Sequence, residues 1–203
     1  MDAEIERSVE EMYARARLSP SEPCGAVKLA TAVLGEACVQ YVDRGRLPGR
    51  AAVTCRAGVV IHLIRGLSLR ELNHSAAHEL GEWHLNANGY AGPDTEELVG
   101  QFAAALCVPR RAFHAGVRAL GENIPALSKA FGVSQSLMVL RVGECLGRPT
   151  ALITRNRIRT RGGRHDWPRT RGEWKQLVDR PWSGGLIVQR IHDAPGRVAL
   201  VRA

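Results

Sequence analysis

The chain has 203 residues, of which 45% are hydrophobic, and its formal net charge at pH 7 is +8. This length fits one large domain or a domain with an appendage, and the hydrophobic fraction excludes wholesale disorder. A run of about 18 apolar residues, which a membrane-spanning helix needs, does not occur, and the acidic first segment does not resemble a signal peptide. These features predict a cytoplasmic protein without a membrane partner, and the basic charge suggests an anionic partner such as DNA.

The first third of the chain predicts two helices followed by a β-hairpin. Apolar residues recur at helical spacing over residues 2–17, and this helix ends before Ser19-Pro20. A second helix covers residues 25–37. Residues 50–64 contain two β-rich runs, AAVTC and VVIHLI, separated by a short turn, so they are expected to form a hairpin.

A longer helix is predicted over residues 69–85. Ser68, with Glu71 three residues later, is the pattern of a capping box at the start of such a helix. Each residue turns a helix by about 100°, so His84 lies about 240° around it from His78. His84 is therefore expected to point away from His78.

One face of this helix carries metal-ligating side chains, in the stretch AAHELGEWHL. His78 and Glu82 are four residues apart and share that face, and His74, one turn earlier, is an alternative ligand. Glu79 lies about 100° from His78, where a base that polarises a metal-bound water belongs. A carboxylate ligand at Glu82 shifts the preference from zinc towards harder ions such as manganese or magnesium. The open alternative is a helix that holds no metal and whose Glu82 faces a salt-bridge partner or water.

The following helix, over residues 95–107, completes a pattern that resembles the ImmA/IrrE family of metallopeptidases. HELG, beginning at His78, is followed by ExxxxxFAAxLxxP, which runs from Glu96 through Phe102 to Pro109. The resemblance implies that His78 is a metal ligand and Glu79 the catalytic glutamate. It places Glu96 as a further metal ligand, with Glu97 as its substitute if the helix is rotated. Glu82 stands where the family has a second histidine, and this is the main departure.

The resemblance covers residues 25–147 and implies an α+β fold. A mainly helical, zincin-like metallopeptidase core with a small β-hairpin or sheet is expected over residues 1–109. A helical segment, similar to a helix-turn-helix and packed on that core, follows over residues 110–148. A basic, β-rich region is expected over residues 149–203.

The same resemblance implies a function and a cofactor. One divalent metal is expected, zinc by resemblance, with manganese as the alternative and no metal if the site is degenerate. The activity would be cleavage of a helix-turn-helix transcriptional repressor, which regulates a mobile element or a stress response. The substrate would be held near the Val59–Ile64 edge by strand addition. The alternative is a catalytically decayed protein that acts as a regulatory, protein- or DNA-binding module.

Residues 127–141 have the pattern of a helix-turn-helix, with Gly132 at the turn and Ser134 capping the second helix. A DNA reader would use Gln135 and Ser136 on base edges and Arg141 on phosphate. However, the unbroken apolar run over residues 137–140 favours a helix packed on more than one side. Packing in the core is therefore the favoured interpretation.

Three strands are predicted after residue 147. The first spans ALITRNRIRTR, residues 151–161, and its alternating arginines would form one basic face. These arginines are Arg155, Arg157, Arg159 and Arg161. Contact with nucleic acid and a solvated strand face are equally supported interpretations of this pattern.

Overall fold

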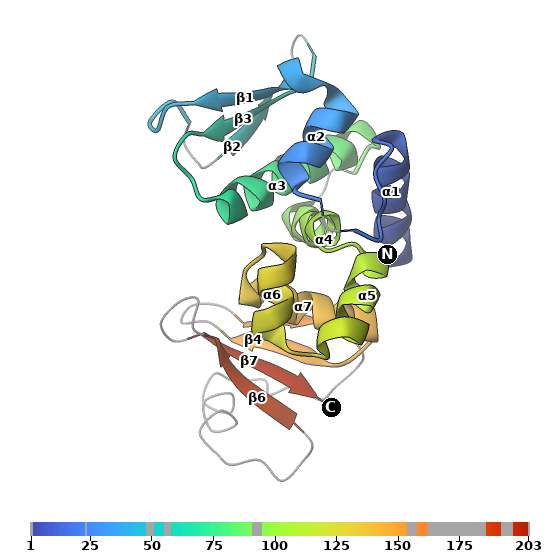
Figure 1. The fold of residues 1–203 in the computed structure, drawn as a ribbon. Coiled ribbons are helices and arrows are strands. Elements are labelled where there is room, and N and C mark those ends of the chain that lie inside the picture. The colour runs from blue at the N-terminus through green and yellow to red at the C-terminus, as the bar shows by residue number, and fades with distance from the viewer. Residues whose placement is uncertain are drawn as a thin grey trace. The chain divides into compact units, whose positions relative to one another are not determined.

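The computed structural model describes residues 2–22, 24–47, 51–54, 58–90, 95–153, 158–161, 186–191 and 197–202, with side chains over 3–22, 24–47, 58–90 and 95–151. Its helices are α1 (Asp2–Arg15), α2 (Ala26–Leu34), α3 (Leu69–Ala87), α4 (Thr95–Cys107), α5 (Arg110–Leu120), α6 (Ile124–Phe131) and α7 (Gln135–Leu146), with a short 3₁₀ helix over Glu36–Cys38 (Figure 1). Its strands are β1 (Val39–Val42), β2 (Ala51–Thr54), β3 (Val60–Ile64), β4 (Thr150–Ile153), β5 (Ile158–Arg161), β6 (Leu186–Ile191) and β7 (Arg197–Arg202). The predicted α+β class, mainly helical with small sheets, is confirmed.

The contacts of the chain divide it into two compact units. Unit 1 comprises residues 1–121 and 129–133, and unit 2 comprises residues 122–128 and 134–203. Each unit is described by itself below. The division into three regions at residues 109 and 148 stays a prediction.

Unit 1 contains a three-stranded sheet in the order β1-β3-β2. The predicted hairpin is confirmed, because β2 pairs antiparallel with β3. The sequence did not predict β1, which pairs parallel with β3 on its other side. Since β3 is the central strand, the expectation that Val59–Ile64 offers a free edge to a peptide is wrong: its hydrogen-bonding groups are used on both sides.

The helix α3 begins where the sequence predicts. The Ser68 hydroxyl accepts a hydrogen bond from the Glu71 backbone N–H at 3.3 Å, and the Glu71 carboxylate accepts one from the Ser68 N–H at 3.0 Å. This capping box pairs two N–H groups that the first turn of a helix leaves without partners. Contacts with β2 and β3 hold α3 against the sheet (Figure 1), and Ile61 and Leu63 on β3 are buried.

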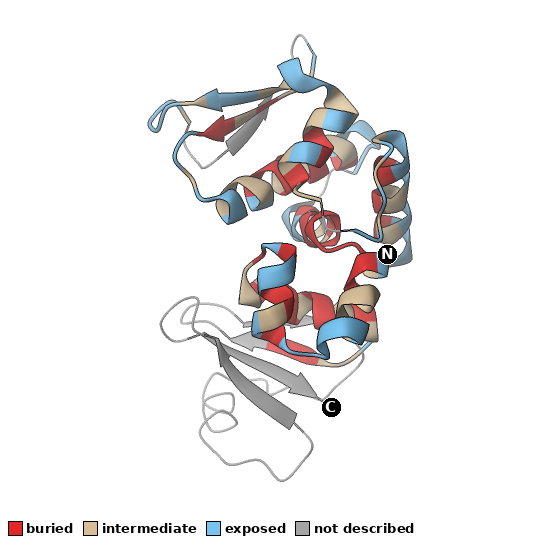
Figure 2. Cartoon of the chain, in the orientation of Figure 1, coloured by how far each residue is buried: buried red, intermediate tan, exposed pale blue. Residues whose placement is uncertain are grey.

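The helices α3 and α4 pack against each other in unit 1. A glycine on α3, Gly81, permits their close approach. A Cβ atom added to Gly81 of α3 would lie 3.2 Å from Cδ1 of Phe102 and 3.6 Å from the Val99 carbonyl oxygen on α4. Phe102 is 1% exposed, and Figure 2 shows α4 carrying many buried residues. The absence of a side chain at Gly81 therefore permits close approach of α4 to the helix that carries His78.

The pair α6 and α7 has the predicted helix-turn-helix pattern. Gly132 adopts a φ of 63°, which favours glycine, and the Ser134 hydroxyl accepts a hydrogen bond from the Leu137 N–H at 3.1 Å. The suggestion that Arg141 contacts phosphate is wrong, since Arg141 is 2% exposed and forms an ion pair with Glu144 at 2.9 Å. Ser136 is buried too. The favoured interpretation of α7 as a packed helix is confirmed.

Unit 2 places α7 against a four-stranded antiparallel sheet in the order β5-β4-β7-β6. The single strand predicted over residues 151–161 is wrong, because β4 and β5 are separate strands paired antiparallel, with Thr150 opposite Arg161. Arg159 and Arg161 lie two residues apart on β5 and so share one face of it. Arg155 and Arg157 lie outside the described residues.

Among the described residues, no helix is both long and apolar enough to cross a lipid bilayer.

Candidate metal centre

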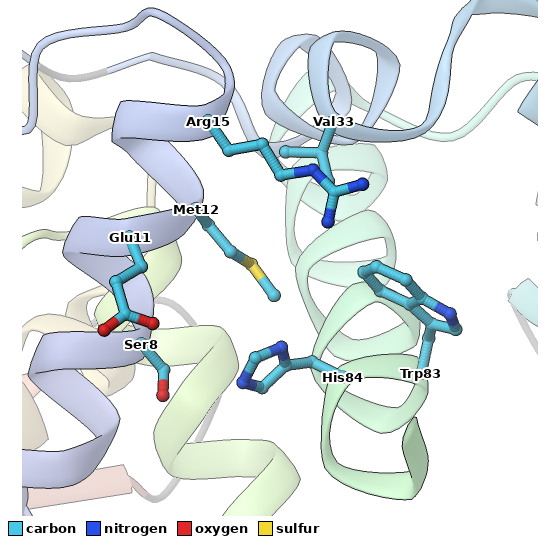
Figure 3. A pocket seen from close by; sticks show the side chains of 7 residues that line it. All are labelled: Ser8, Glu11, Met12, Arg15, Val33, Trp83 and His84. Atoms are coloured by element: carbon cyan, nitrogen blue, oxygen red, sulfur yellow. The ribbon is translucent and has the colours of Figure 1, made fainter. Parts of the chain in front are cut away.

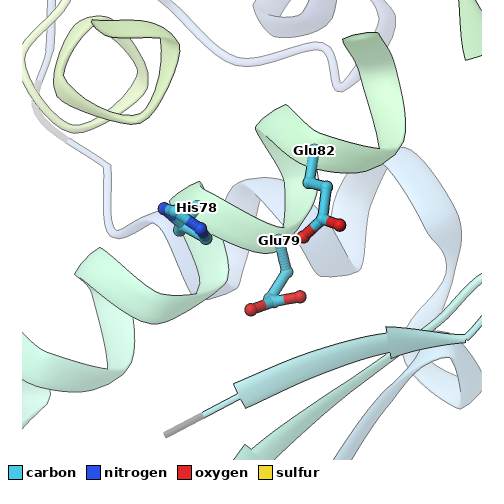
Figure 4. Close-up of side chains that lie close together, drawn as sticks. All are labelled: His78, Glu79 and Glu82. Atoms are coloured by element: carbon cyan, nitrogen blue, oxygen red, sulfur yellow. The ribbon is translucent and has the colours of Figure 1, made fainter. Parts of the chain in front are cut away.

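The donor atoms of His78, Glu79 and Glu82 gather on α3. One ligand atom of each residue lies within 4.8 Å of the others, and Figure 4 shows the three side chains close together on this helix. The spacing of four residues brings His78 and Glu82 onto one face, as the sequence predicts. Glu79 precedes Glu82 by three residues, so the two positions are neighbours on the helix surface and their carboxylates belong to the same group. We refer to these three residues as the His78 cluster.

The His78 cluster is partly shielded from solvent. Glu79 is buried, with 7% of its surface exposed, while the His78 side chain is 27% exposed and Glu82 is half-buried. Two carboxylates this close repel one another, and a divalent cation between them would offset that repulsion. Imidazole nitrogen and carboxylate oxygen are both ligands of divalent metals, so the residues present fit such an ion.

Glu96, from the first turn of α4, reaches the edge of the cluster. Its Oε1 lies 3.8 Å from Nε2 of His78. It does not join the group of mutually close donor atoms, and its side chain is 82% exposed. The structure thus brings together the two residues that the sequence pattern selects from separate helices, with the Glu96 carboxylate on the solvent side of His78.

The alternative ligands are placed differently. His74 and Glu97 are both exposed and are not members of the cluster. Within the part of the chain whose side chains are described, no arginine or lysine forms an ion pair with Glu82. The salt-bridge alternative for Glu82 therefore finds no partner among these residues.

His84 lies apart from the His78 cluster, as helical geometry predicts. Its ring stacks on Phe102, with 5.0 Å between the ring centroids. It also lines a pocket of about 170 Å³ between α3, α1 and α2 (Figure 3), whose other lining residues are Ser8, Glu11, Met12, Arg15, Val33 and Trp83. Burial lowers the pKa of His84, and the nearby Glu11 carboxylate opposes this in part.

The lowered pKa of His84 predicts a pH dependence of stability. The unfolded chain binds a proton at this histidine near pH 6.5, whereas the folded chain takes it up only at lower pH. The stability that the neutral, buried His84 ring contributes is therefore complete above about pH 6.5 and is lost as the pH falls through the folded-state pKa. In urea unfolding between pH 7 and pH 5, we expect His84→Gln to lose less stability than the wild type. Equal losses in both proteins would contradict the assignment.

Comparisons with known proteins support the fold alone. No protein-family model matches the chain, and no curated protein matches it either. Among solved structures, the chain is similar to a Mycobacterium tuberculosis transcriptional regulator, with a TM-score of 0.61. The match has 14% sequence identity and covers 98% of this chain and 74% of the regulator. A likeness at this identity concerns the arrangement of helices and strands, since one fold hosts many functions.

Proposed function

We propose that this chain is a cytoplasmic, metal-dependent endopeptidase of the ImmA/IrrE type, whose substrate is a helix-turn-helix transcriptional repressor. The observation that carries the proposal is the His78 cluster, with donor atoms within 4.8 Å of one another and Glu96 at 3.8 Å from His78. His78, Glu82 and Glu96 would hold one divalent metal. The exposed Glu96 side chain has the freedom to turn towards the ion. The substrate class rests on the resemblance of HELG and ExxxxxFAAxLxxP to that family.

In the proposed reaction, Glu79 is the general base. A bound divalent cation would supply Lewis-acid polarisation of the scissile carbonyl and of the attacking water. Glu79 would accept a proton from that water as its oxygen bonds to the carbonyl carbon. The same carboxyl group would then give the proton to the amide nitrogen as the C–N bond breaks. The burial of Glu79 favours this role, because a shielded carboxylate is a better proton acceptor than a solvated one.

A substrate strand would add to the outer edge of β2 rather than to β3. Among the described strands, β2 pairs with β3 alone, and β2 also contacts α3. A peptide paired with Ala51–Thr54 would therefore run next to the helix that carries the His78 cluster.

The second candidate function is a regulatory protein that keeps the fold without catalysis. Two observations favour it. One solved structure that this chain resembles is called a transcriptional regulator, and Glu82 adds a negative charge to the site. That charge would weaken the pull of a metal on its water and so reduce hydrolysis. Such a protein would act on a protein partner or on DNA.

The metal content of the purified protein tests the metal site on which the peptidase proposal rests. The full chain, purified without added ions, is expected to carry about one divalent ion per chain, because the donors lie close together before binding. His78→Ala is expected to lose it, as measured by inductively coupled plasma mass spectrometry, while keeping its circular dichroism spectrum. A wild-type protein without metal, matched by the variant, would refute a metal-dependent function.

Turnover distinguishes the two functions. New protein N-termini can be labelled and sequenced in cells that express the wild type or Glu79→Gln. The peptidase predicts cleavage within helix-turn-helix proteins that the variant does not produce. Identical N-termini in the two samples would leave the regulatory function.

A further inference from the structure

We infer that Glu82 tunes the His78 cluster for manganese(II) at the expense of zinc(II). This inference rests on the proposed metal site and names the ion that the site selects. Zinc is the ion expected from the family resemblance, so the inference departs from it on the basis of the donors that the fold brings together.

The donor set is rich in oxygen and poor in nitrogen. Among the described residues, His78 is the one imidazole in the cluster, and it is joined by the carboxylates of Glu79 and Glu82. A third carboxylate, that of Glu96, lies 3.8 Å from His78. Imidazole and thiolate ligands favour zinc, whereas carboxylate and water ligands favour manganese and magnesium. Magnesium is the weaker candidate, because it is bound mainly by oxygen atoms and water and does not use the imidazole of His78 well.

The geometry also suits an ion that binds water molecules in addition to its protein ligands. Catalytic zinc sites typically hold three protein ligands and one water in a four-coordinate arrangement, whereas manganese takes six ligands, several of them oxygen. Here the side that Glu96 approaches is open, with the Glu96 side chain 82% exposed and that of His78 27% exposed. Water molecules have access to this side. The proposed ligands, two carboxylates and one imidazole, together with added water, give an oxygen-rich, six-coordinate set that suits manganese.

Glu82 is the residue that decides between the two ions. It lies four residues after His78, so a histidine there would point at the same place on the same face of α3. Glu82→Gln provides the matched control, since it removes the charge without adding a nitrogen ligand. Comparing the two variants separates the effect of charge from the effect of imidazole.

The test measures zinc and manganese binding to the full chain after removal of metal. Manganese binding is followed by electron paramagnetic resonance of the free ion, and zinc binding by competition with a chromophoric chelator. We expect Glu82→His to increase zinc affinity relative to manganese affinity by about tenfold or more. Glu82→Gln is expected to weaken manganese binding without this gain in zinc affinity. An unchanged ratio in Glu82→His would overturn the inference and leave the metal site standing.

Other outcomes separate this inference from the proposed function. If the wild type binds neither ion, or binds both as well after His78→Ala, the proposed metal site itself fails. If circular dichroism shows that Glu82→His does not fold, manganese bound to the wild-type protein provides the test instead. This manganese should show coupling to one directly bound ¹⁴N nucleus, that of His78. Coupling to none would overturn the inference.

Discussion

Replacing Phe102 with alanine is expected to lower the free energy of unfolding by about 3–5 kcal/mol. Phe102 is 1% exposed, its ring stacks on His84, and its side chain is the nearest neighbour of Gly81. Removing the ring would leave a cavity between α3 and α4 in the most closely packed helix pair of unit 1. The loss would include both the apolar burial of the ring and the contacts of the atoms around it.

Urea unfolding followed by circular dichroism measures this effect. Leu69→Ala is the control, because Leu69 is also an apolar residue of unit 1 but is 72% exposed, and its removal should change stability little. If Phe102→Ala cost no more than Leu69→Ala, the packing of α4 on α3 would be wrong. Metal binding at the proposed site should weaken too in Phe102→Ala, because α3 and α4 carry different proposed ligands.

Arg141→Ala is expected to destabilise unit 2 by a similar amount, about 3–5 kcal/mol. Arg141 is 2% exposed, and its guanidinium lies 2.9 Å from a Glu144 carboxylate whose side chain is 9% exposed. Truncating the arginine leaves a buried negative charge without this partner. The double variant Arg141→Met/Glu144→Leu should recover most of the loss, since apolar residues often replace a buried ion pair at little cost.

The same variants test the idea that α7 reads DNA. An exposed arginine on phosphate would leave stability unchanged on removal and would make duplex binding less sensitive to salt. A stable Arg141→Ala protein with weakened duplex binding would contradict the buried position. The buried position of Arg141 would be supported if Arg141→Ala is destabilised and the double variant Arg141→Met/Glu144→Leu regains the stability.

Local rules predict the helices of this chain well. The capping box at Ser68, the glycine at Gly132 and the stop before Pro109 are each set by a few neighbouring residues, and the structure has helix boundaries at all three. The face shared by His78 and Glu82 follows from helical spacing. These features depend on residues close in the sequence, so the sequence alone suffices for them.

Features set by distant residues were missed. The strand Val39–Val42 is short and half-exposed, and it is a strand because β3, some twenty residues later, pairs with it. Arg141 is buried on a helix that packs against the sheet of unit 2, whereas a charged residue is normally expected at the surface.

Gly81 also links the stability of unit 1 to its chemistry. His78 belongs to α3 and Glu96 to α4, so the distance between these two proposed ligands depends on the separation of the helix axes. A metal site tolerates ligand displacements of only about 0.2 Å, which is comparable to the shift that even a methyl group at position 81 would require of Phe102. The glycine of HELG would thus control the distance between the proposed ligands without contacting the proposed ion. At the proposed site, metal affinity would therefore depend on the packing of α4 against α3.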